Sequence, residues 1–154
     1  MILEPSQIET AVKIDRNALD DALIEQASIF YSISERATEA ISKRDAAKAA
    51  LDQLCSQTSV FIRQNPSQFS FKQTEGSIAD AVLTNPQVMQ AQALYLSTKH
   101  DADFWQNAQA TFEMRGKALH DLVTLFVAGY FMNAGEGGYS NLREVSRQSH
   151  QQPK

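Results

Sequence analysis

The sequence has a single cysteine, few glycines and prolines, and no long apolar run. Cys55 has no second cysteine to pair with, and we expect a small packed side chain there rather than a nucleophile. No apolar run approaches the roughly 20 residues that a membrane span requires. Glu4 and Glu9 stand where a signal peptide would be basic. We therefore expect a cytoplasmic protein without a membrane partner, in the host cell cytoplasm if a phage encodes it.

The sequence also lacks the motifs of known catalytic and metal sites. It contains no phosphate-binding glycine loop, no GxSxG or HExxH motif and no paired cysteines. His100, Asp101 and Asp103 are the nearest approach to a metal site, but three adjacent polar residues on a helix turn are typical of a solvated surface. We expect no enzymatic activity, no metal and no cofactor.

Glycine and proline are absent from residues 20 to 64, which predicts one long helix. Its predicted inner stripe has apolar residues at both ends and the basic Arg44 and Lys48 in the middle. The apolar or small members of this stripe are Leu23, Ala27, Phe30, Ser34, Ala37, Ile41, Leu51, Cys55, Thr58 and Ile62. A helix with such a stripe needs a partner helix to cover it.

Asn65-Pro66 ends this helix, because the residue before a proline is forced out of helical geometry. Residues 67 to 73 alternate polar and aromatic residues and predict an extended segment. A cap at residues 74 to 77 predicts a short helix. Asn85 and Pro86 then predict the N-cap and first position of a second long helix, which reaches about Phe131 with apolar residues at three-four spacing.

The fold class predicted from these elements is all-α, a long antiparallel helical hairpin with a short intervening helix. Residues 1–19 form an N-terminal arm, with Ile14 and Leu19 expected to dock onto the body. The hairpin domain comprises residues 20–133, and residues 134–154 form a flexible C-terminal tail.

The second helix ends in a segment that is apolar nearly all round, and one partner helix cannot cover it. We therefore expect a homo-oligomer that meets at this end. The residues expected in the contact are Leu122, Val123, Phe126, Val127, Tyr130 and Phe131.

Basic and aromatic residues gather around the end of the first long helix and on the segment that follows it. Single-stranded nucleic acid is held by cations on its backbone and by aromatic rings on which bases stack. The candidates are Arg44, Lys48, Phe61, Arg63, Phe71 and Lys72. The alternative is that the charges solvate the helix surface and that Phe69 or Phe71 closes the end of the hairpin.

The order of parts resembles the UvsY-type recombination mediators of T-even-like phages, over roughly residues 14 to 137. The resemblance rests on the lead-in Ile14-Asp15 and Leu19, the long charged helix, Thr74-Glu75 with Ile78, Met114-Arg115-Gly116 with Leu119, and Gly129-Tyr130-Phe131. It implies a small helical oligomer that binds single-stranded DNA and helps load a strand-exchange recombinase onto strands covered by single-strand-binding protein. The basic residues that it assigns to DNA contact are Lys43, Arg44, Lys48 and Arg63.

Two hypotheses from different classes follow. The first is a recombination mediator whose partners are single-stranded DNA, a recombinase and a single-strand-binding protein. The second is a helical oligomeric scaffold or assembly adaptor that binds protein only. The net charge of −4 favours the adaptor, because affinity for phosphates comes chiefly from Lys and Arg. The basic middle of the first helix favours the mediator.

Overall fold

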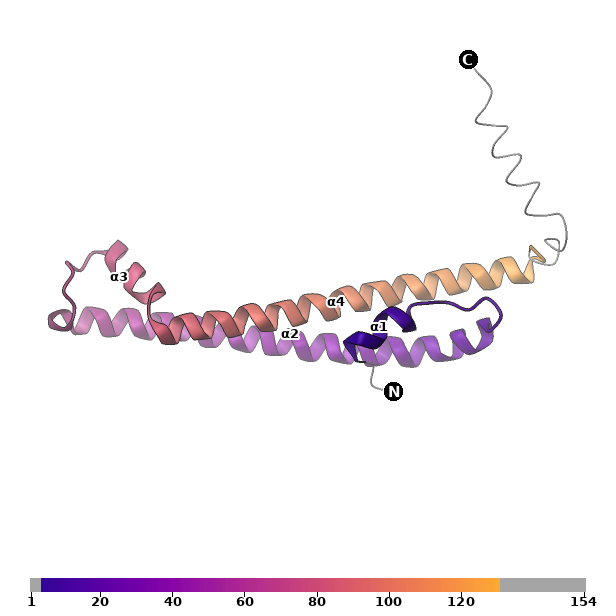
Figure 1. The fold of residues 1–154 in the computed structure, drawn as a ribbon, viewed down its shortest axis with the longest axis horizontal. Coiled ribbons are helices and arrows are strands. Elements are labelled where there is room, and N and C mark those ends of the chain that lie inside the picture. The colour runs from indigo at the N-terminus through magenta and orange to yellow at the C-terminus, as the bar shows by residue number, and fades with distance from the viewer. Residues whose placement is uncertain (1–3, 131–154) are drawn as a thin grey trace, which may run out of the picture.

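The computed structural model describes residues 4 to 130, and within them the chain is all-α, with no strand. Two long helices, α2 (Leu19–Gln64) and α4 (Pro86–Val127), make up most of this region. Two short ones, α1 (Pro5–Ala11) and α3 (Glu75–Leu83), and a 3-10 turn (Pro66–Gln68) accompany them. Figure 1 shows α2 and α4 lying alongside each other, with α3 at one end of the pair and α1 against the other half.

The contacts between α2 and α4 show that the two helices run in opposite directions. Gln26 Nε2 donates to the Phe112 carbonyl (2.8 Å), and Gln109 Nε2 donates to Ser34 Oγ (3.2 Å). Later positions on α2 therefore meet earlier positions on α4. At 46 and 42 residues the helices are about 69 and 63 Å long, since each residue adds about 1.5 Å.

The helix boundaries follow from local sequence. α2 ends at the residue before Asn65, and its first turn carries Asp20 and Asp21 at the positive end of the helix dipole. α4 begins as predicted: Asn85 Oδ1 accepts from the Gln87 amide (2.8 Å), and Pro86 occupies the first turn. The predicted short helix and its cap are confirmed too, because Thr74 Oγ1 accepts from the Ser77 amide that begins α3.

Three apolar clusters follow one another between the long helices. The largest lies in the middle and combines aliphatic residues of α2 with two alanines and two rings of α4: Ile33, Ala37, Ala40, Ala102, Trp105, Ala108 and Phe112. At the α3 end, which we call the turn end, the cluster is Ile62, Ile78, Val82 and Val88. At the opposite, open end it is Leu19, Ala22 and Leu119.

The predicted stripe of the first long helix is wrong at its first two members, Leu23 and Ala27, and holds at Phe30, Ala37 and Ile41, which belong to the central cluster. Ala22 and Ile33 are buried in this half of the helix, whereas Leu23 is 43% exposed and Ala27 is exposed. A helix turns 3.6 residues per turn rather than 3.5, so a strict seven-residue reading drifts off the buried side over several turns. Near the turn end the predicted stripe holds, since Leu51, Cys55 and Ile62 contribute to the cluster there.

Gly116 of α4 makes room for a side chain of α2, although glycine has a low helix propensity. A Cβ added at this position would stand 3.2 Å from Gln26 Nε2, which is closer than ordinary contact. The glycine thus leaves room for the Gln26 side chain to cross from α2 and reach the Phe112 carbonyl.

The N-terminal arm contains a helix that the sequence did not predict, α1. Pro5 stands in its first turn, and the Glu4 amide donates to Gln7 Oε1 (2.9 Å). Ile8, Ala11 and Val12 pack against the central cluster. The predicted docking of Ile14 and Leu19 is confirmed, because both belong to the cluster at the open end.

At the other terminus α4 stops a few residues earlier than predicted, at Val127, and Gly129 adopts a positive φ of 71° just beyond it. This left-handed conformation is the one that glycine adopts readily after a helix end. Phe131 and the predicted tail 134–154 lie outside the described residues.

Candidate nucleic-acid interface

The candidate DNA-contacting residues fall into two groups rather than one site. Lys43, Arg44 and Lys48 lie in the middle of α2, whereas Phe61, Arg63, Phe71 and Lys72 lie at the turn end. Lys48 and Arg63 are 15 residues apart on one helix, which is about 22 Å. Any strand that touched both groups would have to follow α2 for several turns.

Each cation of the middle group is paired with a carboxylate of the same helix. The pairs are Lys43 with Glu39 (2.7 Å), Arg44 with Asp45 (2.8 Å) and Lys48 with Asp52 (3.1 Å). The hydrogen bond and the charge of Lys43 lower the pKa of the Glu39 carboxyl below its ordinary value. The middle of α2 therefore presents alternating charges instead of a positive strip.

Arg44 and Lys48, predicted to interrupt the buried stripe, differ in burial. The Arg44 side chain is 27% exposed and pairs with Asp45 of the same helix. Lys48 is 55% exposed, and its Nζ stands 5.8 Å from the centroid of the Tyr95 ring on α4. The stripe position beside it is filled by the buried Ala47.

The three phenylalanines at the turn end form a chain of ring contacts. Phe69 meets Phe61 edge-on at 6.4 Å and lies 5.5 Å from Phe71. Phe69 and Phe71 pack against the cluster at the turn end, which agrees with the alternative that one of them closes the end of the hairpin. Phe61 is 50% exposed and is the most exposed of the three rings.

The two cations nearest Phe61 differ in their surroundings. Arg63 Nη2 donates to Glu75 Oε2 (2.8 Å), and its Nη1 donates to Ser59 Oγ (2.9 Å). Lys72 makes no ion pair within the described part of the chain, residues 4 to 130. It is the candidate cation whose charge is least compensated.

Arg36 and Trp105 are residues that the sequence prediction missed. They line one hollow together with Lys43, Glu39 and Asp101. The Arg36 guanidinium stands 5.7 Å from the centroid of the Trp105 ring, and Glu4 of the N-terminal arm approaches it at 3.7 Å. Arg36 precedes Lys43 by seven residues, so the helical period was the signal that could have connected them.

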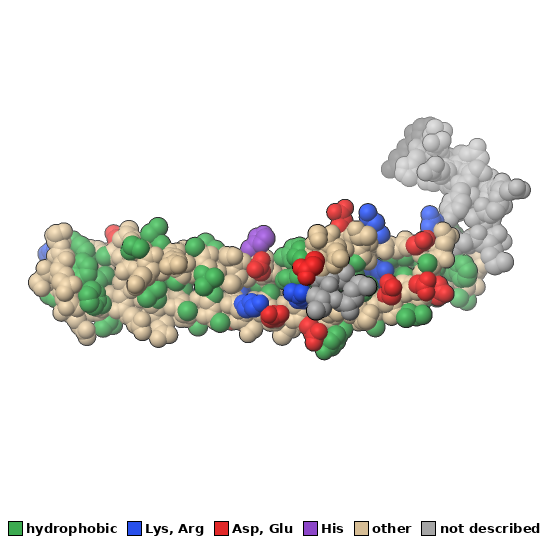
Figure 2. Space-filling model, turned by 60° about the horizontal axis from the view of Figure 1, so that its bottom comes forward, with side chains coloured by type: hydrophobic (Ala, Val, Ile, Leu, Met, Phe, Trp, Pro, Cys, Tyr) green, Lys and Arg blue, Asp and Glu red, His purple; other side chains and the backbone are tan. Residues whose placement is uncertain are grey.

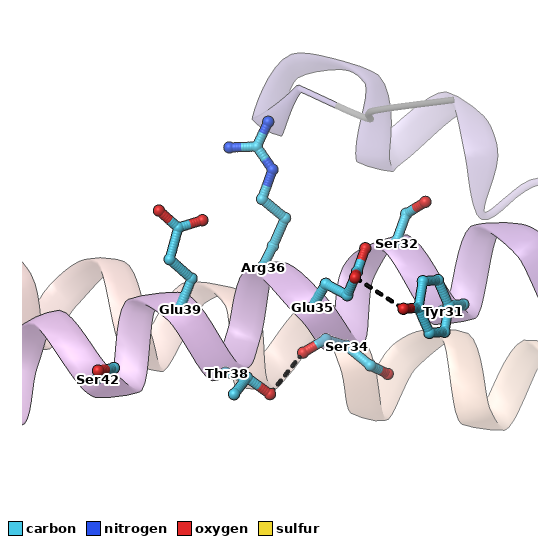
Figure 3. A pocket seen from close by; sticks show the side chains of 8 residues that line it. All are labelled: Tyr31, Ser32, Ser34, Glu35, Arg36, Thr38, Glu39 and Ser42. Atoms are coloured by element: carbon cyan, nitrogen blue, oxygen red, sulfur yellow. Dashed lines mark hydrogen bonds between the residues drawn. The ribbon is translucent and has the colours of Figure 1, made fainter.

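A second hollow lies along α2 beside α1, and Figure 3 shows its lining. Tyr31 Oη donates to Glu35 (2.8 Å), and this bond and the carboxylate charge raise the pKa of the phenol. Arg36 points away from these groups toward α1 (Figure 3). Thr38 Oγ1 donates to the Ser34 carbonyl, and Ser34 Oγ accepts from Gln109 of α4. The charged residues of the lining have both signs, so the hollow favours neither an anionic nor a cationic ligand.

The described residues contain no group of three or more His, Cys, Asp or Glu side chains placed to hold a metal ion. His100, Asp101 and Asp103 are all exposed on α4. Across residues 4 to 130, no helix combines the length and the apolar character needed to span a bilayer.

Of the residues expected at the subunit contact, the structure packs two within the chain and leaves three exposed. Leu122 and Val123 pack within the chain against the cluster at the open end. Phe126, Val127 and Tyr130 are 57%, 80% and 44% exposed. Phe131 lies outside the described residues. The apolar surface left at the open end is thus smaller than the sequence predicted.

Comparison with known proteins found no match to the chain among protein-family models, curated proteins or solved structures.

Proposed function

We propose that the chain is a recombination mediator without enzymatic activity. It binds single-stranded DNA and helps load a phage strand-exchange recombinase onto strands covered by single-strand-binding protein. The order of its parts, which resembles the UvsY-type mediators, supports this proposal. The residues that carry it in the structure are those around Phe61.

The observation behind the proposal is a half-exposed aromatic ring that shares the turn end of the molecule with two candidate cations. The ring of Phe61 is 50% exposed, although Phe69 and Phe71 already close the cluster beneath it. Arg63 follows two residues later, and Lys72 has no ion pair among the described residues. Stacking on a ring together with cations on the backbone holds a single strand without reading its sequence.

We propose further that α2 and α4 act as one long antiparallel hairpin and that hairpins assemble into an oligomer through the open end. Phe126 and Val127 support this proposal, because large apolar side chains at a helix end are costly to leave in water. An oligomer would place several turn-end sites along one strand, which raises the avidity of individually weak contacts.

Fluorescence anisotropy of a labelled single-stranded oligonucleotide across a salt series tests the DNA site. Phe61→Ala should weaken binding by the value of one stacked base, about 1–3 kcal/mol, without changing the salt slope. Lys72→Ala should flatten the slope of log affinity against log salt by about 0.7, the value of one phosphate contact to a single strand.

Matched controls come from elsewhere in the chain. Tyr31→Ala removes an exposed ring elsewhere on α2, about 45 Å from Phe61, and Lys117→Ala removes an exposed lysine on α4. Neither should change affinity per subunit. Parent-like binding by both turn-end variants would exclude this site, and a parent without salt-dependent binding would remove the DNA proposal.

The second candidate is the scaffold or adaptor that binds protein only. The ion pairs of α2 favour it, because Lys43, Arg44, Lys48 and Arg63 each meet a carboxylate of the chain. A phosphate would have to displace these carboxylates before it gained the contact. The same anisotropy experiment separates the two functions, since the adaptor binds no oligonucleotide at any salt concentration.

A further inference from the structure

Charge is distributed unevenly along the molecule. Of the 32 charged residues in the chain, four (Arg63, Lys72, Glu75 and Asp80) lie between positions 53 and 98, and their charges cancel. The first thirteen residues of α4, positions 86 to 98, contain none. In the face shown in Figure 2, acidic and basic side chains gather over the half that carries α1, while the half toward the turn end is mostly apolar or uncharged.

Within this uncharged stretch, α4 carries apolar residues on a side that neither α2 nor α3 covers. Met89 is 58% exposed and Leu96 is 54% exposed, and Ala93 between them is exposed too. The spacing of four and three places them in one row along the helix. We call Met89, Ala93 and Leu96 the outer row.

We propose that the outer row is a contact between two copies of this chain, in which the two α4 helices cross antiparallel about a twofold axis beside Ala93. A twofold contact uses the same surface on both subunits, so the surface must be complementary to itself. An axis between Gln92 and Ala93 sets Met89 against Leu96 of the partner subunit. The small Ala93 at the centre lets the two helices approach closely.

The absence of charge favours a second copy over a nucleic acid or a charged protein surface. In this arrangement position 86 meets position 99, so the uncharged stretch of one helix lies on that of the other. The first charge, Lys99, falls about 10 Å from the axis, at the rim. A surface without a cation makes no phosphate contacts, and a charged protein surface would lose its hydration here without gaining an ion pair.

The composition of the row also fits an interface. The buried centres of subunit contacts are depleted in charged residues and enriched in methionine and aromatic residues. Here Gln90 and Gln92 flank the row on its two sides and supply side chains that both donate and accept hydrogen bonds, so like groups can pair across a twofold axis. This contact is separate from the one proposed at the open end, and it does not depend on DNA binding.

Cysteine cross-linking tests the twofold axis directly. In a Cys55→Ala background, Ala93→Cys brings two thiols together beside the axis, within the 4.4–6.8 Å between Cα atoms that a disulfide requires. Mild oxidation at micromolar protein concentration should convert most of this variant into a covalent dimer. Ala110→Cys is the matched control, because it is an exposed alanine on the same helix about 25 Å away.

A second measurement keeps Cys55 and needs no oxidation. Leu96→Glu places a carboxylate in the contact and should lower the mass seen by light scattering, whereas Met114→Glu, at an equally exposed position of α4, should not. Ala93→Cys that cross-links no faster than Ala110→Cys would overturn the proposal. An unchanged mass for Leu96→Glu would overturn it as well.

Discussion

Gln26 and Arg115 form a polar contact inside an otherwise apolar stretch between α2 and α4. Arg115 is only 7% exposed, and its Nη1 donates to Gln26 Oε1 while Gln26 Nε2 donates to the Phe112 carbonyl. Arg115 Nε is buried and has no acceptor among the described residues. Burial lowers the pKa of the guanidinium, and the charge of Glu25 opposes this.

Replacing Gln26 removes the acceptor from a buried charged group. We expect Gln26→Ala to lower the free energy of unfolding by about 1–3 kcal/mol, measured by urea denaturation, because the Arg115 guanidinium then lacks its partner. Gln106→Ala, at an exposed position of α4, should stay within about 0.5 kcal/mol of the parent.

The double variant Gln26→Leu with Arg115→Met separates the pair from the space it occupies. Replacing a buried polar pair by apolar residues of similar volume is often neutral or stabilising, so stability should return to the parent level or above. Equal losses for Gln26→Ala and Gln106→Ala would show that the contact carries no weight. If the double variant is as stable as the parent, the pair of Gln26 and Arg115 fixes the register of the two helices more than it adds stability, since only one alignment of α2 and α4 joins the two residues.

At the scale of single helices, the ion pairs of α2 control how much free positive charge the helix offers. Titration of the Glu39 carboxyl by NMR should give a pKa below its ordinary 4.5, and Lys43→Ala should raise it toward that value. A carboxyl with a lowered pKa in the folded state stabilises the fold at neutral pH. That contribution is lost as the pH falls through the Glu39 pKa.

The corresponding pair on α4 supplies the control. Lys117 and Glu113 are also four residues apart at 2.7 Å, and the pKa of Glu113 is lowered by the same causes. Lys117→Ala should therefore raise the pKa of Glu113 and leave that of Glu39 unchanged. If Lys43→Ala left the pKa of Glu39 unchanged, the pair would not form in solution. The Lys43 side chain would then be free to bind phosphate.

The helices and their caps could be predicted from sequence because their signals are local. Asn85 and Pro86 stand next to the amides that they cap or replace, and the boundary at Asn65 needs only the following proline. The stripe on α2 could not be placed to the residue, because Gln26 faces α4 and the apolar Leu23 does not. Which polar residue faces inward depends on a partner 86 positions away.

In the candidate site too, contacts between residues close in sequence could be predicted, and contacts between distant residues could not. The pairs of Lys43 with Glu39 and Lys48 with Asp52 are four residues apart, and helix periodicity alone could have predicted them. The pair of Arg63 with Glu75 joins two elements through a turn and could not be predicted that way. Helix α1 was missed because its few apolar residues gain a partner only on the central cluster.

At the scale of the whole molecule, exposed apolar residues at the open end and in the outer row predict two separate subunit contacts. Phe126→Glu should lower the mass measured by light scattering, because a carboxylate without a partner is costly to bury. Phe61→Glu changes a ring of similar exposure at the turn end and should leave the mass unchanged.

Combining the two contacts gives the sharpest form of this prediction. Phe126→Glu together with Leu96→Glu should yield the 17.1 kDa monomer, while each single variant keeps the contact that the other loses. A parent that is already monomeric at micromolar concentration would contradict both contacts.

The antiparallel pairing of α2 and α4 also sets the order in which the chain closes on itself during folding. Ile62 and Val88 at the turn end are 26 positions apart in sequence, whereas Leu19 and Leu119 at the open end are 100 apart. Closing the longer loop first would cost about 1.2 kcal/mol more in chain entropy. We therefore expect the contacts between α2 and α4 to form first near α3 and last near Phe126. The open end is then the last part to pack during folding and the first to separate, and a subunit that joins there separates with it.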